Sequence, residues 1–278
     1  MRKRNKGSQF LASIGFSGIA FFLLVAIFAE WLAPHPISEI VGSVWQGPSR
    51  EALLGTDNIG RDLLSRVIWG TRLTLSIAAA ATILAFLIGV PLGFLAALTR
   101  GWPDQVLSRG NDLLMAIPTL IFALVVLAVL PKNVFILIVV IAVLEATRVF
   151  RVSRAIACDI VVLDYIEIAR LRGESKSWII FHEVLPNALS PLLAEFGLRF
   201  VFSILFLSTL SFLGLGVQPP IADWGSLVKE NKDGLMFGVF AALIPGGTIA
   251  LLAISVNFVV DWILQRTTSL KRGAQNNG

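Results

Sequence analysis

The sequence has few of the residues on which soluble, secreted and metal-binding proteins rely. Only 15% of its 278 residues are charged, against about 25% in soluble domains, so an ordinary water-soluble fold is excluded. The single cysteine, Cys158, excludes an internal disulfide, and we interpret it as a small apolar residue. The two histidines, His35 and His182, are far apart in the sequence, and we expect no metal site.

Motifs of common catalytic chemistry are also missing. The sequence has no Gly-x-x-x-x-Gly-Lys-Ser/Thr phosphate loop, no Gly-x-Ser-x-Gly turn and no His-Glu-x-x-His helix. We therefore expect a chain that is not an enzyme and has no cofactor of its own. The net charge of +5 is not gathered in a basic, aromatic-rich patch, so we expect no nucleic-acid partner.

Hydrophobic residues dominate instead, at 56% of the chain with a mean hydropathy of +0.80. They form long continuous runs, whereas a membrane β-barrel has short alternating segments. With about 20 residues for each crossing, the sequence predicts an all-α membrane protein in the lipid bilayer with about six transmembrane helices. The expected spans are 10–33, 73–98, 113–130, 134–150, 189–213 and 237–264.

Charge predicts the orientation. We expect cytoplasmic tails at 1–9 and 265–278, an external segment at 34–72, and a core domain at 73–264 that includes a cytoplasmic loop at 151–188. Of the 23 Lys and Arg residues, Arg199 falls within a span and fifteen fall on the predicted inner side. The seven on the outer side are Arg50, Arg61, Arg66, Arg72, Lys132, Lys229 and Lys232. This excess agrees with the positive-inside rule, which places both termini in the cytoplasm.

The polar stretch 164–188 interrupts the apolar runs and predicts two short helices. Gly173 ends the first, because glycine tolerates the left-handed conformation that closes a helix. Ser175 or Ser177 can cap the second, which we expect to stop before Pro186.

This stretch resembles the cytoplasmic "EAA" loop of ABC importer permeases, with the pattern Glu-Ala-Ala, three residues, Gly, nine residues, Ile-x-Leu-Pro. The matching residues are Glu167, Ala169, Gly173, Leu185 and Pro186. Two positions depart from the pattern, Ile168 and Glu183. The resemblance implies a loop that sits in a groove of an ATP-hydrolysing subunit, with polar contacts from Glu167, Arg170, Arg172 and Glu174. The alternative is a solvated loop between two spans.

A second motif lies in the predicted external segment. The run Leu54-Gly-Thr-Asp-Asn-Ile-Gly-Arg-Asp-Leu-Leu-Ser-Arg66 resembles the signature of the dipeptide, oligopeptide and nickel permease subfamily. The matching residues are Gly55, Thr56, Asp57, Gly60, Arg61, Asp62, Ser65 and Arg66. We expect Thr56 and Asp57 to cap a helix and the Asp and Arg residues to pair. The segment either shapes the external side or contacts a substrate-binding protein. The run 210–220, followed by Trp224, resembles the same subfamily.

Two further features fall inside predicted spans. Glu195 and Arg199 are one helical turn apart and can pair, either at the cytoplasmic interface or at membrane depth, where ionisable groups are usually functional. Pro245, Gly246 and Gly247 are expected to interrupt the last span, where they could line the translocation path or form a hinge.

Together, these motifs resemble the binding-protein-dependent ABC importer permeases (transport inner membrane components) of the peptide and nickel class. The resemblance implies a type I importer permease fold in the bacterial inner membrane, a second homologous permease subunit, two ATPase subunits that bind ATP and Mg, and a substrate-binding protein. Its expected role is half of the path for short peptides, or for a nickel chelate, glutathione or an opine. The alternative is a stand-alone secondary transporter.

Overall fold

The computed structural model describes residues 6–99 and 101–275, and these are helical apart from connecting segments and two isolated β-bridges. The predicted tails 1–9 and 265–278 extend past these ranges, with 1–5 and 276–278 outside them. The helices are α1 (Lys6–Ile27), α2 (Ala29–Leu32), α3 (Leu63–Thr99), α4 (Trp102–Ala116), α5 (Thr119–Val129), α6 (Val134–Val161), α7 (Asp164–Leu171), α8 (Lys176–Ile179), η1 (Ile180–Val184), α9 (Leu185–Phe212), α10 (Trp224–Asn231), η2 (Lys232–Phe237) and α11 (Leu243–Gln275).

Within residues 6–99 and 101–275, four helical segments are long and apolar enough to cross a membrane: Gly7–Ile27, Leu63–Thr99, Lys176–Phe212 and Leu243–Gln265. A fifth arises if the bent pair α4–α5 counts as one span. Helix α6 has 28 residues, about 42 Å of helix, but includes Glu145, Arg148 and Arg151. The predicted all-α membrane fold is confirmed, with four to five such spans where the sequence predicts about six.

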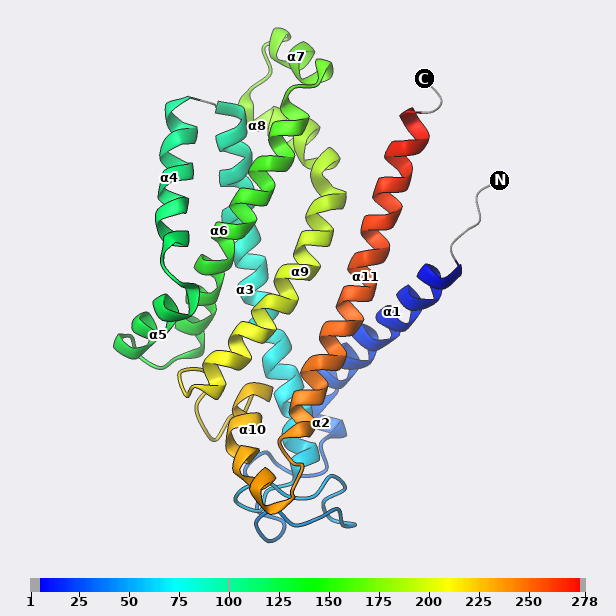
Figure 1. Ribbon diagram of the computed structural model, residues 1–278, viewed down its shortest axis with the longest axis vertical. Helices are drawn as coiled ribbons and strands as arrows, with labels where there is room; N and C mark the ends of the chain where they lie inside the picture. Colours follow the sequence, from blue (N-terminus) through cyan, green and yellow to red (C-terminus); the bar gives the residue numbers. More distant parts are fainter. Residues whose placement is uncertain (1–5, 100, 276–278) are drawn as a thin grey trace.

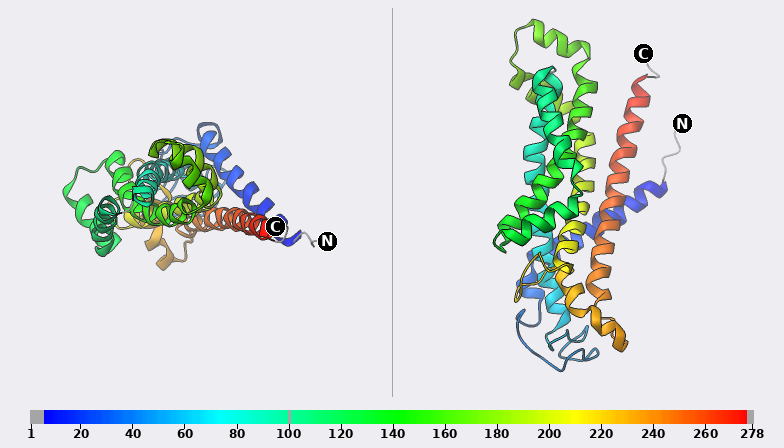
Figure 2. Two further views of the ribbon diagram at one scale, coloured as in Figure 1. Left: turned by 90° about the horizontal axis from the view of Figure 1, so that it is seen from above. Right: turned by 60° about the vertical axis from the view of Figure 1, so that its left-hand side comes forward.

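Helices α3, α6 and α9 pack together in the centre of the molecule (Figure 1). On one side α1 packs along α11, and on the other lie α4 and α5, an arrangement that the view from above repeats (Figure 2). One end of the bundle carries α7, and the other carries the 33–62 segment and α10 (Figure 1). The N-terminal end of α1 and the C-terminal end of α11 are both directed toward the end of the bundle that carries α7 (Figure 1).

Helix α3 begins at Leu63, ten residues before the start expected for the second span. The capping expectation for Thr56 and Asp57 is wrong, because the carboxylate that caps this start belongs to Asp62. Its Oδ2 accepts from the Ser65 backbone N–H at 2.9 Å. The Ser65 hydroxyl donates to the same oxygen at 2.5 Å. The end of the predicted external segment is therefore the first turns of a buried helix.

The expected third span is also different in the structure. Helix α4 combines residues 102–112, which lie between the expected second and third spans, with 113–116, the start of the expected third span, and α5 follows at a bend of 82°. Pro118 explains the bend, since a proline disfavours helical backbone in the preceding residue, and Ile117 is extended at φ −83° and ψ 129°.

Two proline predictions are wrong. Helix continues from Lys176 to Phe212, and Pro186 lies inside it, just after a π-helical turn at Ile180–Val184, instead of ending a helix. The hydrogen-bond ladder is already shifted there, because the Leu185 N–H donates to the Ile180 carbonyl five residues back. Pro245 lies in the first turn of α11, so Pro245, Gly246 and Gly247 do not interrupt a span. A proline in a first turn breaks no helical hydrogen bond, because that N–H has no partner in any case.

Candidate functional sites

The α7–α8 segment is fixed to the bundle by a few apolar side chains. Ile166 and Ala169 are fully buried and pack in one cluster with side chains of α3, α6 and α9. Ile179, on α8, is in the same cluster. The segment is therefore attached rigidly to the central helices although it lies at their tip.

The turn inside this segment has the predicted chemistry. Gly173 has φ +80°, the left-handed conformation that favours glycine, and its N–H donates to the Arg170 carbonyl at 3.0 Å. The hydroxyl of Ser175, one of the two predicted caps, accepts from the Trp178 N–H at 3.2 Å. These two predictions are confirmed.

The outward face of the segment is charged and apolar. Glu167, Arg170 and Arg172 are exposed, and Glu174 is half-buried. None of the four forms an ion pair with the described side chains, 7–99 and 101–265. Leu171, between the two arginines, is 82% exposed. Leu185 and Pro186 of the motif lie at the start of α9. This face is available to another protein.

The predicted external signature forms a buried ion cluster. Asp57 Oδ2 accepts from Arg61 Nε and from Arg66 Nη1, both at 2.6 Å. Asp57 and Arg66 are fully buried. Glu230 of α10 adds a second carboxylate, at 2.8 Å from Arg61 and 2.5 Å from Arg66. The cluster ties the signature segment and the start of α3 to α10, 164 residues further along the chain.

The pKa of Asp57 reflects opposing effects. Burial is the largest and would raise the pKa, but the Ile59 and Arg61 backbone N–H groups and the charges of Arg66 and Arg61 together lower it below the ordinary 3.8. Asp57 is therefore held as a carboxylate near neutral pH, as the ion cluster requires.

The remaining signature residues shape the loop around this cluster. Gly55 and Gly60 have φ +78° and +88°, and a side chain on either would collide with the backbone of the 42–47 turn. The Thr56 hydroxyl donates to the Ser43 carbonyl at 2.5 Å and accepts from the Gln46 N–H at 2.7 Å. All eight signature residues are thus fixed by this fold, with Asp62 and Ser65 at the helix cap.

The run after α9 returns the chain into the bundle. Trp224, at the start of α10, is fully buried, its ring edge-on to Phe22 of α1 at 5.6 Å. Its backbone N–H donates to Thr74 Oγ1 of α3 at 3.1 Å, and its indole N–H donates to the Val67 carbonyl at 3.3 Å. The predicted external loop is therefore a packed element at this end.

A second charge cluster joins α6 to α9. Arg199 lies 2.8 Å from Glu195, the predicted pair, and 3.1 Å from Glu145 of α6, which is 1% exposed. Arg148 contacts the other Glu145 oxygen at 2.7 Å and donates to Thr119 at the start of α5 at 3.3 Å. The four charges cancel, and they link three helices.

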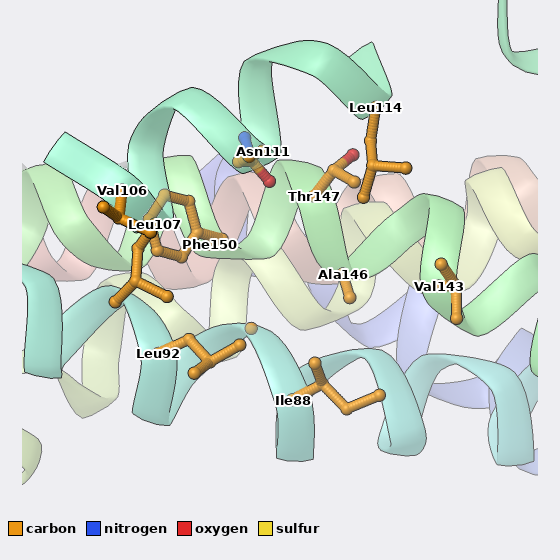
Figure 3. A pocket seen from close by; sticks show the side chains of 12 residues that line it. Ile88, Leu92, Val106, Leu107, Asn111, Leu114, Val143, Ala146, Thr147 and Phe150 are labelled. Atoms are coloured by element: carbon orange, nitrogen blue, oxygen red, sulfur yellow. The ribbon is translucent and has the colours of Figure 1, made fainter. Parts of the chain in front are cut away.

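An apolar cavity of about 340 Å³ lies between α3, α4 and α6. Figure 3 shows Ile88 and Leu92 of α3 facing Val106 and Leu107 of α4 and Phe150 of α6. The wall of the cavity has few polar groups, one of which is the side-chain amide of Asn111. This cavity suits apolar groups and has no charge for a polar solute.

Pro245, Gly246 and Gly247, predicted as a path or hinge, lie in the first turns of α11. Cβ atoms added at Gly246 or Gly247 would meet no atom within 4 Å, so neither glycine serves a close contact in this chain. Among the described residues no group of three His, Cys, Asp or Glu side chains could hold a metal ion.

Two ion-pair partners, Glu230 and Glu145, could not be identified from the sequence. Both pair with arginines far away in the chain, and no local spacing signals such a contact.

The fold and these sites agree with comparisons to known proteins. The family described as "Binding-protein-dependent transport system inner membrane component" matches residues 89–269. The chain is 33% identical over 260 residues to the dipeptide transport system permease protein DppC of Alkalihalophilus pseudofirmus, covering 93% of this chain and 84% of that one. It is 34% identical to the di/tripeptide permease protein DppC of Pseudomonas aeruginosa, with 88% and 84% covered.

Further relatives and a solved structure extend the comparison. The glutathione transport system permease protein GsiD of Pectobacterium atrosepticum is 32% identical, with 88% of this chain and 83% of that one covered. A structure of the MetNI methionine ABC transporter in inward-facing conformations shares the fold, with a TM-score of 0.57 at 17% identity over 72% of this chain and 95% of that one.

The fold and its sites define an ABC importer permease. The chain belongs to the binding-protein-dependent transport system inner membrane components, in the peptide class of ABC permeases. It is a non-catalytic, multi-pass subunit in the bacterial inner membrane.

Proposed function

We propose that this chain forms half of the translocation path of an ATP-driven importer and that the α7–α8 segment couples it to separate ATPase subunits. The observation that carries the proposal is the exposed charged face of Glu167, Arg170 and Arg172, which form no ion pair with the described side chains, at the tip of one continuous helix, Lys176–Phe212. A push on this tip moves a continuous helical segment of 37 residues, about 55 Å long.

The helix places Arg199 in the second charge cluster, 23 residues from Lys176. A displacement of the tip is therefore passed to Glu145 of α6 and, through Arg148, to the start of α5. ATP binding by the ATPases closes them, the segment moves with them, and the spans open outward to receive solute. Hydrolysis resets the spans.

The assembly consists of this chain, a second homologous permease, two ATPase subunits and a substrate-binding protein. The ATPase subunits bind ATP and Mg. The solute is a short peptide, which the dipeptide and di/tripeptide relatives support. The glutathione relative is compatible with this class, since glutathione is itself a peptide.

The test is ATP-dependent uptake of a labelled tripeptide by proteoliposomes that contain the complex. We expect uptake only when the ATPase subunits and the substrate-binding protein are both present. Uptake by this chain alone, driven by an ion gradient, would replace the proposal with a stand-alone secondary transporter.

A further inference from the structure

A polar pocket of about 390 Å³ lies at the α10 end of the bundle, the end that the proposed function places outside. Its wall comes from Asn58 of the signature segment, from the 211–219 turn, and from side chains of α10 and η2. The volume is within the range of about 300–1,000 Å³ found for small-molecule sites.

Most charges in this wall are already neutralised within the chain. Glu230 is paired with Arg61 and Arg66. Lys232 is paired with Asp233 at 2.8 Å. Lys229 is exposed and has no carboxylate at ion-pair distance among the side chains that the structure describes. The pocket therefore presents one unpaired positive charge.

The fold leaves room for this ammonium group. Gly214 has φ +89°, and a methyl group added there would come within 2.5 Å of Lys229 Nζ. The Gly214 and Gly216 carbonyls accept hydrogen bonds from the Gln218 side chain at 3.3 and 2.9 Å. The turn that faces Lys229 is thus fixed by its own hydrogen bonds.

The same pocket has an unused hydrogen-bond acceptor. Asn58 Oδ1 is buried and has no donor within hydrogen-bond distance among the side chains and backbone that the structure describes. The backbone N–H of Asn58 donates to Asn231 Oδ1 at 3.1 Å, and Asn231 is fully buried. A buried acceptor without a donor is costly, so a ligand N–H placed here would be favourable.

We propose that this pocket is an entry subsite for the free carboxylate of a short peptide, with the Lys229 ammonium as the partner of the carboxylate. Asn58 Oδ1 accepts a hydrogen bond from an N–H of the same solute. The inference rests on the proposed function, because it names how an imported peptide is first held by this subunit. An acidic side chain of the binding protein is the competing occupant.

Site-specific protection of lysine tests the proposal. The complete complex in lipid nanodiscs is treated with an amine-acetylating reagent, and the acetylation of Lys229 and Lys132 is followed by mass spectrometry. The probes are trialanine, trialanine amide and the peptide-free binding protein. Lys132 is the internal control, since it is exposed and does not line this pocket.

Trialanine should slow the acetylation of Lys229 by about tenfold when present at ten times its dissociation constant, and trialanine amide should not. Lys132 should react at one rate throughout, and Asn58→Ala should weaken the protection of Lys229. Equal protection by the acid and the amide, or none by either, would overturn the proposal. Protection by the binding protein alone would overturn it in favour of a protein contact. Peptide uptake is measured separately, so its failure would count against the proposed function and not against this pocket.

Discussion

The Arg66 guanidinium lies 2.6 Å from the Asp57 carboxylate, and both side chains are fully buried. This pair joins the first turn of α3 to the loop before it, and Glu230 extends it to α10. A buried charge that loses its partner is strongly unfavourable, so the ion cluster fixes the shape of this end of the bundle.

Asp57→Asn should destabilise the protein by about 3–5 kcal/mol, because it leaves Arg66 and Arg61 buried with Glu230 alone. Asp233→Asn is the control, since its pair with Lys232 is exposed, and it should change stability by less than about 0.5 kcal/mol. Thermal unfolding in detergent measures both. Equal effects would contradict the importance of the buried cluster.

The same carboxylate predicts a pH dependence. Because the pKa of Asp57 is lowered below 3.8 in the folded protein, its stabilising contribution is complete above the unfolded pKa and is lost as the pH falls through the folded one. The unfolding temperature of the wild-type protein should therefore drop more steeply below pH 3.8 than that of Asp57→Asn. If the unfolding temperatures of the two proteins fell in parallel with pH, the stabilising role of the Asp57 carboxylate would be contradicted.

Much of the α7–α8 segment could be predicted because its signals are local. Gly173 and Ser175 act within their own turns, so their types reveal their roles. The partners Glu230 and Glu145 could not be predicted, since their contacts depend on how distant helices pack. Pro118 and Pro245 lie at helix starts, whereas Pro186 lies inside a helix just after a π-helical turn. The sequence alone does not say which of these positions a proline occupies.

Gly173→Val should leave membrane insertion intact and reduce the uptake obtained for each ATP hydrolysed. Nothing lies within 4 Å of an added Cβ at this position, so the cost comes from the left-handed backbone, about 1–2 kcal/mol. Gly173→Asn is the matched control, because asparagine visits this conformation readily. Peptide uptake and ATPase activity, both measured in proteoliposomes, give the uptake for each ATP hydrolysed. A normal value in the Gly173→Val variant would contradict a role of this turn in coupling.

The contact between α1 and α11 depends on small residues. A side chain at Gly18 would collide with Ser255 of α11, so Gly18→Leu should separate the two helices. Gly7→Leu is the control, as no atom lies within 4 Å there. Ser8 Oγ donates to Gln265 at 2.6 Å, so cysteines at positions 8 and 265, with Cys158→Ser, can be joined by a short bis-maleimide. Cross-linking should fail in the Gly18→Leu variant and succeed in the Gly7→Leu control. Cross-linking of the Gly18→Leu variant would contradict the packing of α1 against α11 described above.

The second charge cluster predicts unequal roles for its two arginines. Arg199→Met should impair folding and uptake more than Arg148→Met, because the Arg199 side chain is 12% exposed and contacts two carboxylates, whereas that of Arg148 is 36% exposed. Yield of folded protein and peptide uptake measure the difference. A larger loss with Arg148→Met would contradict this view of the cluster.

The most direct test of the account asks which proteins the α7–α8 segment meets. A cysteine replaces Leu171, which is 82% exposed, in the Cys158→Ser background. In a second variant a cysteine replaces Met236, which is 88% exposed in η2, the element that packs on α10. We predict that position 171 cross-links to an ATPase subunit and is shielded from an impermeant thiol reagent added outside the cell, whereas position 236 reacts with that reagent. Labelling of position 171 from outside, without any ATPase cross-link, would contradict the account.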